Sequence, residues 1–541
     1  MPRRSLLLPL TFLLLTSLAC QTIYKAFELP NPEGLATDAF PTATPKAGQA
    51  TLTPPPTRAS VTPKTPGATA TLQPTLPAEY ADLAQFQAAQ RDGFTSDIAQ
   101  FPHATRYALE VTVTFGDASA FLDGRERIHY TNQQTFPLAT LYLMLWPNDR
   151  DQYLSEMTLQ NVRVDSVPLN FSLENDGIAA RIDLPQPLAP GAALDVSAEF
   201  SVSAHPGIDD TTPARFGLTN GVLLAPTFYP LIPRIIDGQW QTIPAPSGGD
   251  TTNSDTALYW WRVTAPKDLT IVASGTVIDS SLAGDTQTQT LVTGPMRDLA
   301  LVVGPLELYQ REVDGLTLNA YVLQDHAAYA PKMLDFTEAQ VQNLQAEVGP
   351  YPFSELDVVD APGAFGGIEY PGEIFIGVVG DSDFFEYATV HEVGHQWFYS
   401  LIGDDQLLQP WLDEAAATYT EYLYQEKVHG SGEAEGFLGY LWDDVKASDN
   451  PDLPIGLGVG DYPSERDYGT IVYSKGALFF DALRRELGDK VFFEFLHNYY
   501  AAYRYGFATS QDFQATAEQT CACDLGALFD LWVYKGGQVK P

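Results

Sequence analysis

Two histidines and a glutamate in the segment HEVGH are the residues best suited to chemistry in this sequence. His391 and His395 are four positions apart, and in a helix of about 3.6 residues per turn this spacing puts both imidazoles on one face. Two imidazoles so placed can bind one metal ion. Glu392 points roughly 100° further round the helix, beside the ion and not onto it, where its carboxylate can take a proton from water. Glu392 is therefore the candidate general base.

A catalytic zinc site takes three protein ligands and leaves one position for water, so a third ligand must come from elsewhere in the chain. A second helical pattern begins after Pro410, and Glu414 falls in its first turn. We predict that Glu414 is the third ligand and that one Zn²⁺ ion is bound. The alternative is that HExxH arose by chance on an amphipathic helix, with both histidines packed in the core or solvated. A glutamate on a following helix, within the sequence WLDE, favours the metal site.

Three short motifs together resemble those of one enzyme family. Eighteen residues separate His395 from Glu414, the segment GGIEYPG spans 366–372, and YSKG spans 473–476. These segments resemble the HExxH-x18-E, GxMEN and YxKG motifs of the M1 zinc aminopeptidases, a gluzincin family that includes aminopeptidase N. The resemblance implies a zinc-dependent aminopeptidase, which removes N-terminal residues from peptides.

Glu369, in the GGIEY segment, has a physical role available in such an enzyme. A carboxylate fixed beside the cleft can pair with the free α-ammonium group of a peptide, which would make the enzyme an exopeptidase. Gly366 and Gly367 have no side chains to obstruct a substrate, so their backbone could hydrogen-bond an extended peptide along a sheet edge. The segment departs from GxMEN at Ile368 and Tyr370, so the shape of the first specificity pocket does not carry over. A tight turn with a surface glutamate is the alternative.

Two tyrosines and a further glutamate complete the candidate site. Tyr473 matches the family tyrosine whose hydroxyl helps to stabilise the oxyanion of the tetrahedral intermediate. Tyr468 matches a nearby tyrosine and is a weaker candidate for contact with substrate. Because the chain contains 27 tyrosines, both could instead be packing residues. Glu421 lies two helical turns beyond Glu414 on the same face, where it could orient a ligand histidine by accepting its N–H. A solvated helix glutamate is the alternative.

The charge of the chain excludes one class of partner. With 68 Asp and Glu against 30 Lys and Arg, the formal net charge is −38, whereas phosphate binding needs a clustered basic surface. We therefore expect no nucleic-acid partner. Peptides with a free N-terminus are the expected substrates, since a negative field favours the approach of a cationic amine. The sequence leaves the oligomeric state open.

The first 20 residues have the pattern of a secretory signal peptide, with basic residues, an apolar run and small residues before Cys20. Cys20 resembles the lipidated cysteine of a bacterial lipobox, so we expect an exported lipoprotein on the outer face of a cell membrane. Ser17 stands where a lipobox usually has leucine, and cleavage to a secreted soluble protein is the alternative. Residues 21–79 are rich in Thr, Pro and Ala and predict a disordered tether.

The remaining sequence predicts a multidomain fold with both α and β structure. Alternating apolar and polar residues predict an all-β domain over 80–311, which by resemblance corresponds to the saddle-like N-terminal domain of M1 enzymes. A helical period then predicts a thermolysin-like α/β zinc peptidase domain over 312–541. A bridge between Cys521 and Cys523 would span one residue and be strained, so we expect two small, partly buried residues. A redox-labile bond is the alternative.

Two other functions fit the same residues. A gluzincin endopeptidase would use the same zinc site but cut internal bonds, without recognition of an amine by Glu369. A catalytically silent surface lipoprotein would bind peptides in the same cleft and not cleave them. The complete set of ligands, base and tyrosine argues against the silent protein.

Overall fold

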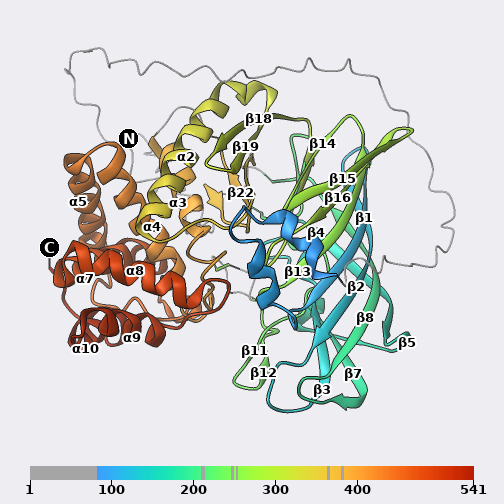
Figure 1. The fold of residues 1–541 in the computed structure, drawn as a ribbon, viewed down its shortest axis with the longest axis horizontal. Coiled ribbons are helices and arrows are strands. Elements are labelled where there is room, and N and C mark those ends of the chain that lie inside the picture. The colour runs from blue at the N-terminus through green and yellow to red at the C-terminus, as the bar shows by residue number, and fades with distance from the viewer. Residues whose placement is uncertain are drawn as a thin grey trace, which may run out of the picture.

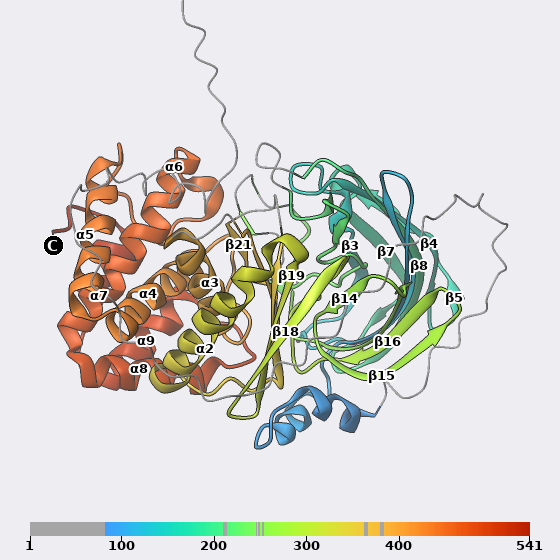
Figure 2. The same cartoon turned by 90° about the horizontal axis from the view of Figure 1, so that it is seen from above.

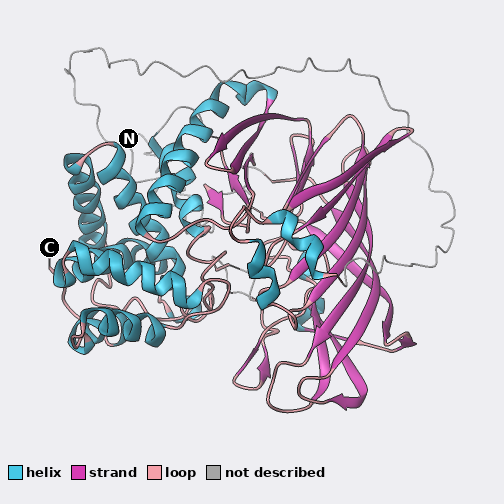
Figure 3. Cartoon of the chain, in the orientation of Figure 1, coloured by secondary structure: helices cyan, strands magenta, loops and turns pink. Residues whose placement is uncertain are grey.

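The computed structural model describes residues 82–208, 214–244, 246, 249–250, 254–361, 366–378 and 383–540. The predicted signal peptide, Cys20 and the whole of the predicted tether lie outside these residues. The described chain forms a β-rich part and a helical part, with a five-stranded sheet between them (Figure 1, Figure 3). Within these residues, no helix has both the length and the apolar character needed to span a bilayer.

The β-rich part is built on an eight-stranded sheet with the strand order β15-β16-β13-β1-β2-β8-β4-β5. Its strands form where apolar residues alternate: in β1 (Arg106–Phe115), Tyr107, Leu109 and Val111 are all buried. Three smaller sheets, β14-β17-β10-β9, β3-β7-β6 and β11-β12, complete this part, which forms a curved shell of strands when seen from above (Figure 2). The predicted all-β domain is therefore present.

The elements of the β-rich part have the following bounds: η2 (Leu83–Ala89), η3 (Thr95–Gln100), β1 (Arg106–Phe115), β2 (Ala120–Thr131), β3 (Leu138–Met144), η4 (Trp146–Asn148), β4 (Ser155–Val164), β5 (Val167–Pro168), β6 (Ser172–Glu174), η5 (Asn175–Gly177), β7 (Ala179–Leu188), β8 (Ala193–Ala204), β9 (Gly217–Thr219), β10 (Val222–Leu224), β11 (Ile235–Ile236), β12 (Gln239–Trp240), β13 (Leu258–Pro266), β14 (Thr270–Ala273), β15 (Thr276–Ala283), β16 (Thr286–Val292) and β17 (Leu301–Gly304).

The helical part packs against a mixed sheet with the order β18-β19-β20-β22-β21. The central strands are buried on both faces, as in β20, where five of the six residues are buried, and β21 forms one edge of the sheet. The helices α2, α3 and α4 pack on one another and carry the HExxH and WLDE segments. The fold thus positions the candidate site between two helices that lie beside a sheet edge.

The elements of the helical part have the following bounds: β18 (Leu306–Val313), β19 (Leu316–Leu323), η6 (Gln324–Tyr329), α2 (Ala330–Glu347), β20 (Glu355–Asp360), β21 (Gly367–Ile368), β22 (Glu373–Ile376), α3 (Asp383–His395), α4 (Trp411–Val428), α5 (Ser431–Ala447), η7 (Val459–Asp461), α6 (Glu465–Tyr468), the π-helix η8 (Gly469–Lys475), α7 (Gly476–Leu487), α8 (Asp489–Tyr503), α9 (Ser510–Cys521), α10 (Gly526–Phe529) and the π-helix η9 (Asp530–Tyr534).

The predicted division between residues 311 and 312 is wrong. It would cut β18 (Leu306–Val313), which pairs along its whole length with β19 in the five-stranded sheet. The chain leaves the β-rich sheets after β17, one strand earlier. β18 alternates buried and exposed residues much as the preceding strands do, and only its pairing partner shows to which part it belongs.

Two consecutive residues of the β-rich part hold the turn that follows α3. Arg297 is 2% exposed and donates from Nε to the carbonyl oxygen of Tyr399 at 2.8 Å, while Asp298 accepts the Tyr399 hydroxyl at 3.0 Å. Tyr399 has a φ of 118°, which a bulky residue adopts only where its surroundings enforce it. A Cβ at Gly403 would lie 2.1 Å from the guanidinium carbon of Arg297. The β-rich part therefore fixes the backbone beside HExxH.

Cys521 and Cys523 form a disulfide, so the expectation of two unpaired residues is wrong. Their Cα atoms are 5.2 Å apart. Ala522 between them has a left-handed backbone, with a φ of 53°, and this turn brings the two side chains together. The expectation failed because it assumed an ordinary extended or helical residue at the central position.

Candidate metal centre

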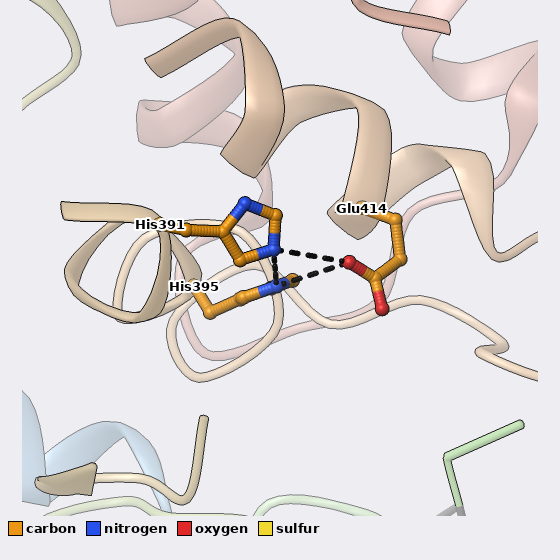
Figure 4. A group of neighbouring side chains, drawn as sticks. All are labelled: His391, His395 and Glu414. Atoms are coloured by element: carbon orange, nitrogen blue, oxygen red, sulfur yellow. Dashed lines mark hydrogen bonds and ion pairs between the residues drawn. The ribbon is translucent and has the colours of Figure 1, made fainter. Parts of the chain in front are cut away.

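The three predicted ligands come together from two neighbouring helices. His391 and His395 lie in the last turns of α3, and Glu414 lies in the first turn of α4 (Figure 4). The Nε2 atoms of the two histidines are 3.0 Å apart, and Glu414 Oε2 is 3.3 Å from each. All three side chains are buried. The structure therefore brings together one oxygen and two nitrogen donors, as the spacing predicts.

Close packing of α3 on α4 makes this convergence possible. A Cβ at Gly394 would lie 2.4 Å from Thr420 Oγ1 and 3.2 Å from the Cα of Ala417. Glycine costs about 1 kcal/mol relative to alanine inside a helix, and here it permits the two helices to approach. Gly394, between the two histidines, thus allows α3 to pack closely on α4.

The spacing of the three donor atoms fits a tetrahedral metal ion. Zinc binds imidazole nitrogen and carboxylate oxygen at about 2.0–2.2 Å, and a tetrahedron with such arms has edges of about 3.3–3.5 Å. The observed separations between His391, His395 and Glu414 are 3.0 to 3.3 Å. The donor set fits zinc in both geometry and ligand type, and one corner of the tetrahedron receives no side chain from these three residues.

Each ligand histidine is oriented through its other ring nitrogen. His391 Nδ1 lies 2.8 Å from Glu421 Oε1, and His395 Nδ1 lies 3.1 Å from the carbonyl oxygen of Phe398. An acceptor at Nδ1 keeps the proton there and leaves the Nε2 lone pair free to bind a metal. Glu421 is 3% exposed, so the alternative of a solvated glutamate does not hold.

Replacing Glu421 with glutamine is expected to weaken zinc binding about 10- to 100-fold. The amide can still accept from His391 Nδ1, but it carries no charge to strengthen that bond. The dissociation constant can be measured by competition with a chromogenic chelator. Glu426→Gln, on the outer part of the same helix, is the control, and an equal dissociation constant for the Glu421 variant and wild type would contradict the orienting role.

The electrostatics of the centre favour a cation. Burial alone would lower the pKa of His395, yet Glu414 raises it to about 10. Burial would also lower the pKa of His391, but Glu414 and Glu421 raise it well above its usual value. Burial opposes ionisation of Glu414, but the two imidazoles hold its pKa far below the ordinary range. Positive charge at this point is therefore stabilised by the surrounding carboxylates.

Glu392 lies beside the donor set and does not belong to it. Its side chain is 2% exposed, and burial raises its pKa to about 8, although the two histidines act in the opposite direction. Gly367 passes directly over this carboxylate: a Cβ there would lie 2.3 Å from Glu392 Oε1. The sequence predicts that Gly367 leaves space for the substrate because it has no side chain. The structure shows that Gly367 also leaves space for the carboxylate of Glu392.

Replacing Gly367 with alanine is expected to lower kcat/KM about 100-fold, because a catalytic group displaced by about 1 Å can lose that much. The added methyl group must push the Glu392 carboxylate aside, since the two would otherwise be 2.3 Å apart. Steady-state kinetics and metal content check the result. Gly432→Ala is the control, because nothing lies within 4 Å of a Cβ at that helical position; wild-type kinetics in the Gly367 variant would contradict this account.

Tyr473 lies at the centre, and Tyr468 lies next to it. Tyr473 is in the π-helix η8 and donates its hydroxyl to Glu414 Oε1 at 2.5 Å. The ring of Tyr468 meets that of Tyr473 edge to face, with centroids 6.0 Å apart. A Cβ at Gly476, the glycine of YSKG, would lie 2.4 Å from the Cβ of Ala415. That glycine therefore lets η8 approach α4 and bring Tyr473 to the metal ligand, and π-helices are common at functional sites.

Glu369 follows β21 and is held from both sides. Its carboxylate Oε1 accepts from Gln406 Nε2 at 3.0 Å, and its carbonyl oxygen accepts from Gln396 Nε2 at 3.3 Å. Gln396 also accepts the backbone N–H of Gly372 at 2.8 Å. Glu369 is 7% exposed, so the alternative of a surface glutamate on a turn does not hold. The sequence reasoning missed Gln396, although it directly follows His395, and Gln406.

One cavity adjoins the metal centre. Its lining includes Gly366, Gly367, His391, Glu392 and Tyr473, which are predicted site residues from three separate segments of the chain. Glu369 and Tyr468 do not belong to this lining. The cavity thus joins the candidate base, the candidate oxyanion donor and the edge strand β21.

Comparisons with known proteins relate the segment that carries the candidate metal centre to one peptidase family. The family profile described as the Peptidase family M1 domain matches residues 381–532. The aminopeptidase M1-D of Oryza sativa subsp. japonica is 23% identical over 310 residues, which are 52% of this chain and 34% of that protein. Aminopeptidase N of Streptomyces lividans is 24% identical over 265 residues, 44% of this chain and 30% of that protein. The chain spans only a fifth to a third of the curated relatives it matches.

A solved structure shares the fold over nearly its whole length. The M1 zinc metallopeptidase from Deinococcus radiodurans has a TM-score of 0.62 and 19% identity, and the match covers 82% of this chain and 97% of that chain. The match covers both the β-rich part and the helical part of this chain. The segment 381–532, which matches the profile of the peptidase family M1 domain, contains all three predicted metal ligands, the candidate base and Tyr473.

Proposed function

We propose that this protein is a zinc-dependent aminopeptidase that removes N-terminal residues from peptides. The observation that carries the proposal is the set of donor atoms of His391, His395 and Glu414, 3.0 to 3.3 Å apart, with the buried Glu392 beside them. His391, His395 and Glu414 would hold the ion. When bound, zinc acidifies water and polarises the scissile carbonyl group.

Glu392 performs the proton transfers. Its carboxylate accepts a proton as water attacks the first peptide carbonyl and then delivers that proton to the leaving amine. The Tyr473 hydroxyl, which now donates to Glu414, lies where it can donate to the oxygen that becomes negative in the tetrahedral intermediate. The surrounding side chains are buried, and a water-poor site strengthens both interactions.

Glu369 selects the end of the chain that is cleaved. A buried carboxylate beside the cleft pairs with the protonated amine of a peptide, and the first carbonyl group then reaches the metal centre. A variant of the Deinococcus radiodurans enzyme has been solved with a Tyr-Ser-Ala substrate, which supports a short peptide as the ligand. The edge strand β21, with Gly366 and Gly367, can pair with an extended substrate.

A pair of reporter substrates tests the proposal. An aminoacyl p-nitroanilide with a free amine should be hydrolysed, its N-acetylated twin should not, and a chelator should abolish the reaction. Equal rates on both reporters would favour the endopeptidase alternative. Zinc bound without hydrolysis of either reporter or of a longer peptide would favour the silent binding protein.

We further propose that the enzyme is exported and anchored through a lipid on Cys20, with residues 21–79 as the tether. The apolar run before Cys20 and the Thr- and Pro-rich segment after it support this proposal. In a bacterial host, wild type should sediment with membranes, and Cys20→Ser should be released in soluble form. Membrane association of the serine variant would contradict a lipid on this residue.

A further inference from the structure

The lysine of the YSKG segment is fully buried and has no role in the chemistry described so far. Lys475 is the last residue of the π-helix η8, two positions after Tyr473, and it is 0% exposed. Its ammonium group donates to the carbonyl oxygens of Pro451 at 2.8 Å and Leu453 at 2.6 Å. Both acceptors belong to the segment 451–456, here called the supporting loop, which lies between α5 and η7. Lys475 therefore links the end of η8 to the supporting loop.

A charged side chain is an expensive way to fill this space. Burial lowers the pKa of Lys475 to about 8, although Asp452 acts in the opposite direction. Two neutral carbonyl groups compensate a buried charge less well than a carboxylate would. An apolar side chain would avoid the cost of burying the charge, but it would leave both carbonyl groups without this donor. The bonds to the supporting loop are therefore what a lysine supplies here and an apolar residue would not.

The supporting loop is itself held by the last residues of the chain. The backbone N–H of Ile455 donates to the carbonyl oxygen of Trp532 at 2.9 Å, and the N–H of Gly537 donates to the carbonyl oxygen of Asp452 at 2.8 Å. The packing is close, because a Cβ at Gly536 would lie 2.3 Å from that same oxygen of Asp452. The loop is thus fixed on the side that faces away from η8, and it can act as an anchor for the π-helix.

A tyrosine connects the supporting loop to the other end of η8. The Tyr462 hydroxyl donates to the carbonyl oxygen of Ile455 at 2.9 Å. Its ring meets that of Tyr468 edge to face, with centroids 5.7 Å apart, and Tyr468 meets Tyr473 in the same way at 6.0 Å. Tyr468 directly precedes η8, and Lys475 ends it. The supporting loop therefore holds the π-helix at both ends, with Tyr473 between them.

The direction of the Tyr473 hydroxyl depends on how η8 is held. A π-helix is rare and usually no longer than one turn, so we expect its position to depend on contacts outside the helix. We propose that Lys475 is a positioning residue, which fixes the end of η8 on the supporting loop and thereby orients the Tyr473 hydroxyl towards the metal centre. This inference rests on the proposed aminopeptidase function and adds to it a residue that does not touch the substrate.

The alternative is that Lys475 only stabilises the fold, and a double-mutant cycle separates the two roles. Tyr473→Phe should lower kcat about 10²- to 10³-fold, the usual cost of one oxyanion donor. Lys475→Met should lower kcat about 10- to 100-fold with little change in KM, because a displacement of about 1 Å can cost that much. In the double variant, kcat should equal that of Tyr473→Phe alone, since the direction of an absent hydroxyl no longer matters.

A milder variant perturbs the supporting loop without changing Lys475. Tyr462→Phe removes the bond to Ile455 and should lower kcat about 2- to 10-fold, the equivalent of one neutral hydrogen bond. This loss should also disappear when Tyr473→Phe is present. Lys446→Met is the control, because the Lys446 side chain on α5 is 60% exposed, and its kinetics should be those of wild type. Thermal denaturation and zinc content show whether each full-length variant is folded and loaded.

Two outcomes would overturn the inference. The first is an unchanged kcat in folded, zinc-loaded Lys475→Met. The second is a double variant in which the two losses multiply, since Lys475 would then act independently of Tyr473. If Lys475→Met does not fold, the Tyr462→Phe cycle decides by the same criterion. These outcomes leave the aminopeptidase proposal intact, because wild type still hydrolyses the free-amine reporter. If wild type hydrolyses no reporter, the proposed function fails first and the inference fails with it.

Discussion

Replacing Glu392 with glutamine is expected to lower kcat/KM about 10²- to 10⁴-fold, the contribution of a positioned general base. Glutamine fills the same space under Gly367, so the fold and the three metal ligands should be undisturbed. It cannot accept a proton from water, and the loss should appear in kcat with little change in KM. Steady-state kinetics on a free-amine reporter, with zinc measured by mass spectrometry, check the result.

A matched control for this variant lies on the same helix. Asp383 is exposed in the first turn of α3, and Asp383→Asn removes one carboxylate without touching the cavity. Its kinetics should be those of wild type. Full activity in zinc-loaded Glu392→Gln would show that another group accepts the proton, and loss of zinc in that variant would mean that Glu392 also supports the ligands.

Replacing Glu414 with alanine is expected to abolish activity through loss of the metal. The carboxylate supplies one of three donor atoms, each 3.0 to 3.3 Å from the others. Its removal should weaken zinc binding by more than the roughly 10- to 100-fold cost of losing an outer hydrogen-bond partner. Two buried imidazoles would then remain without the anion that stabilises charge beside them. Zinc content after dialysis and activity across a zinc titration measure the effect.

The same experiment tests the stoichiometry. Wild type should contain one zinc ion per chain. The neighbouring carboxylates of Glu369 and Asp413 already accept N–H donors from Gln406, so we expect no second ion there. Chelation should remove both zinc and activity, and added zinc should restore them in wild type but not in Glu414→Ala. Wild-type zinc content in the alanine variant, or activity that survives complete chelation, would refute the assigned ligand set.

Local geometry explains why the metal ligands could be predicted from the sequence. The separation of His391 and His395 fixes their directions as soon as the segment is helical, and the apolar period after Pro410 predicts the helix that carries Glu414. The β-strands were equally readable, because alternation is a property of neighbouring residues. Those features need no knowledge of the rest of the chain.

The features that sequence reasoning missed depend on contacts between distant segments. Asp250, Glu369 and Asp413 each offer a carboxylate oxygen within 4.8 Å of the other two only because a loop of the β-rich part reaches the first turn of α4. The role of Gly367 beside Glu392 follows from the approach of β21 to α3, which no local pattern reports. The boundary at 311 failed for a similar reason, since β18 is assigned by its partner and not by its own residues.

The contact of Arg297 and Asp298 with Tyr399 has a consequence for how this protein can be engineered. Tyr399 would lose both partners if the helical part were produced alone, and an unsupported left-handed tyrosine costs about 1–3 kcal/mol. The buried apolar core is also continuous across the two parts. The parts should therefore unfold in a single cooperative transition, and chimaeras that recombine them between relatives should succeed only when this contact is transplanted with them.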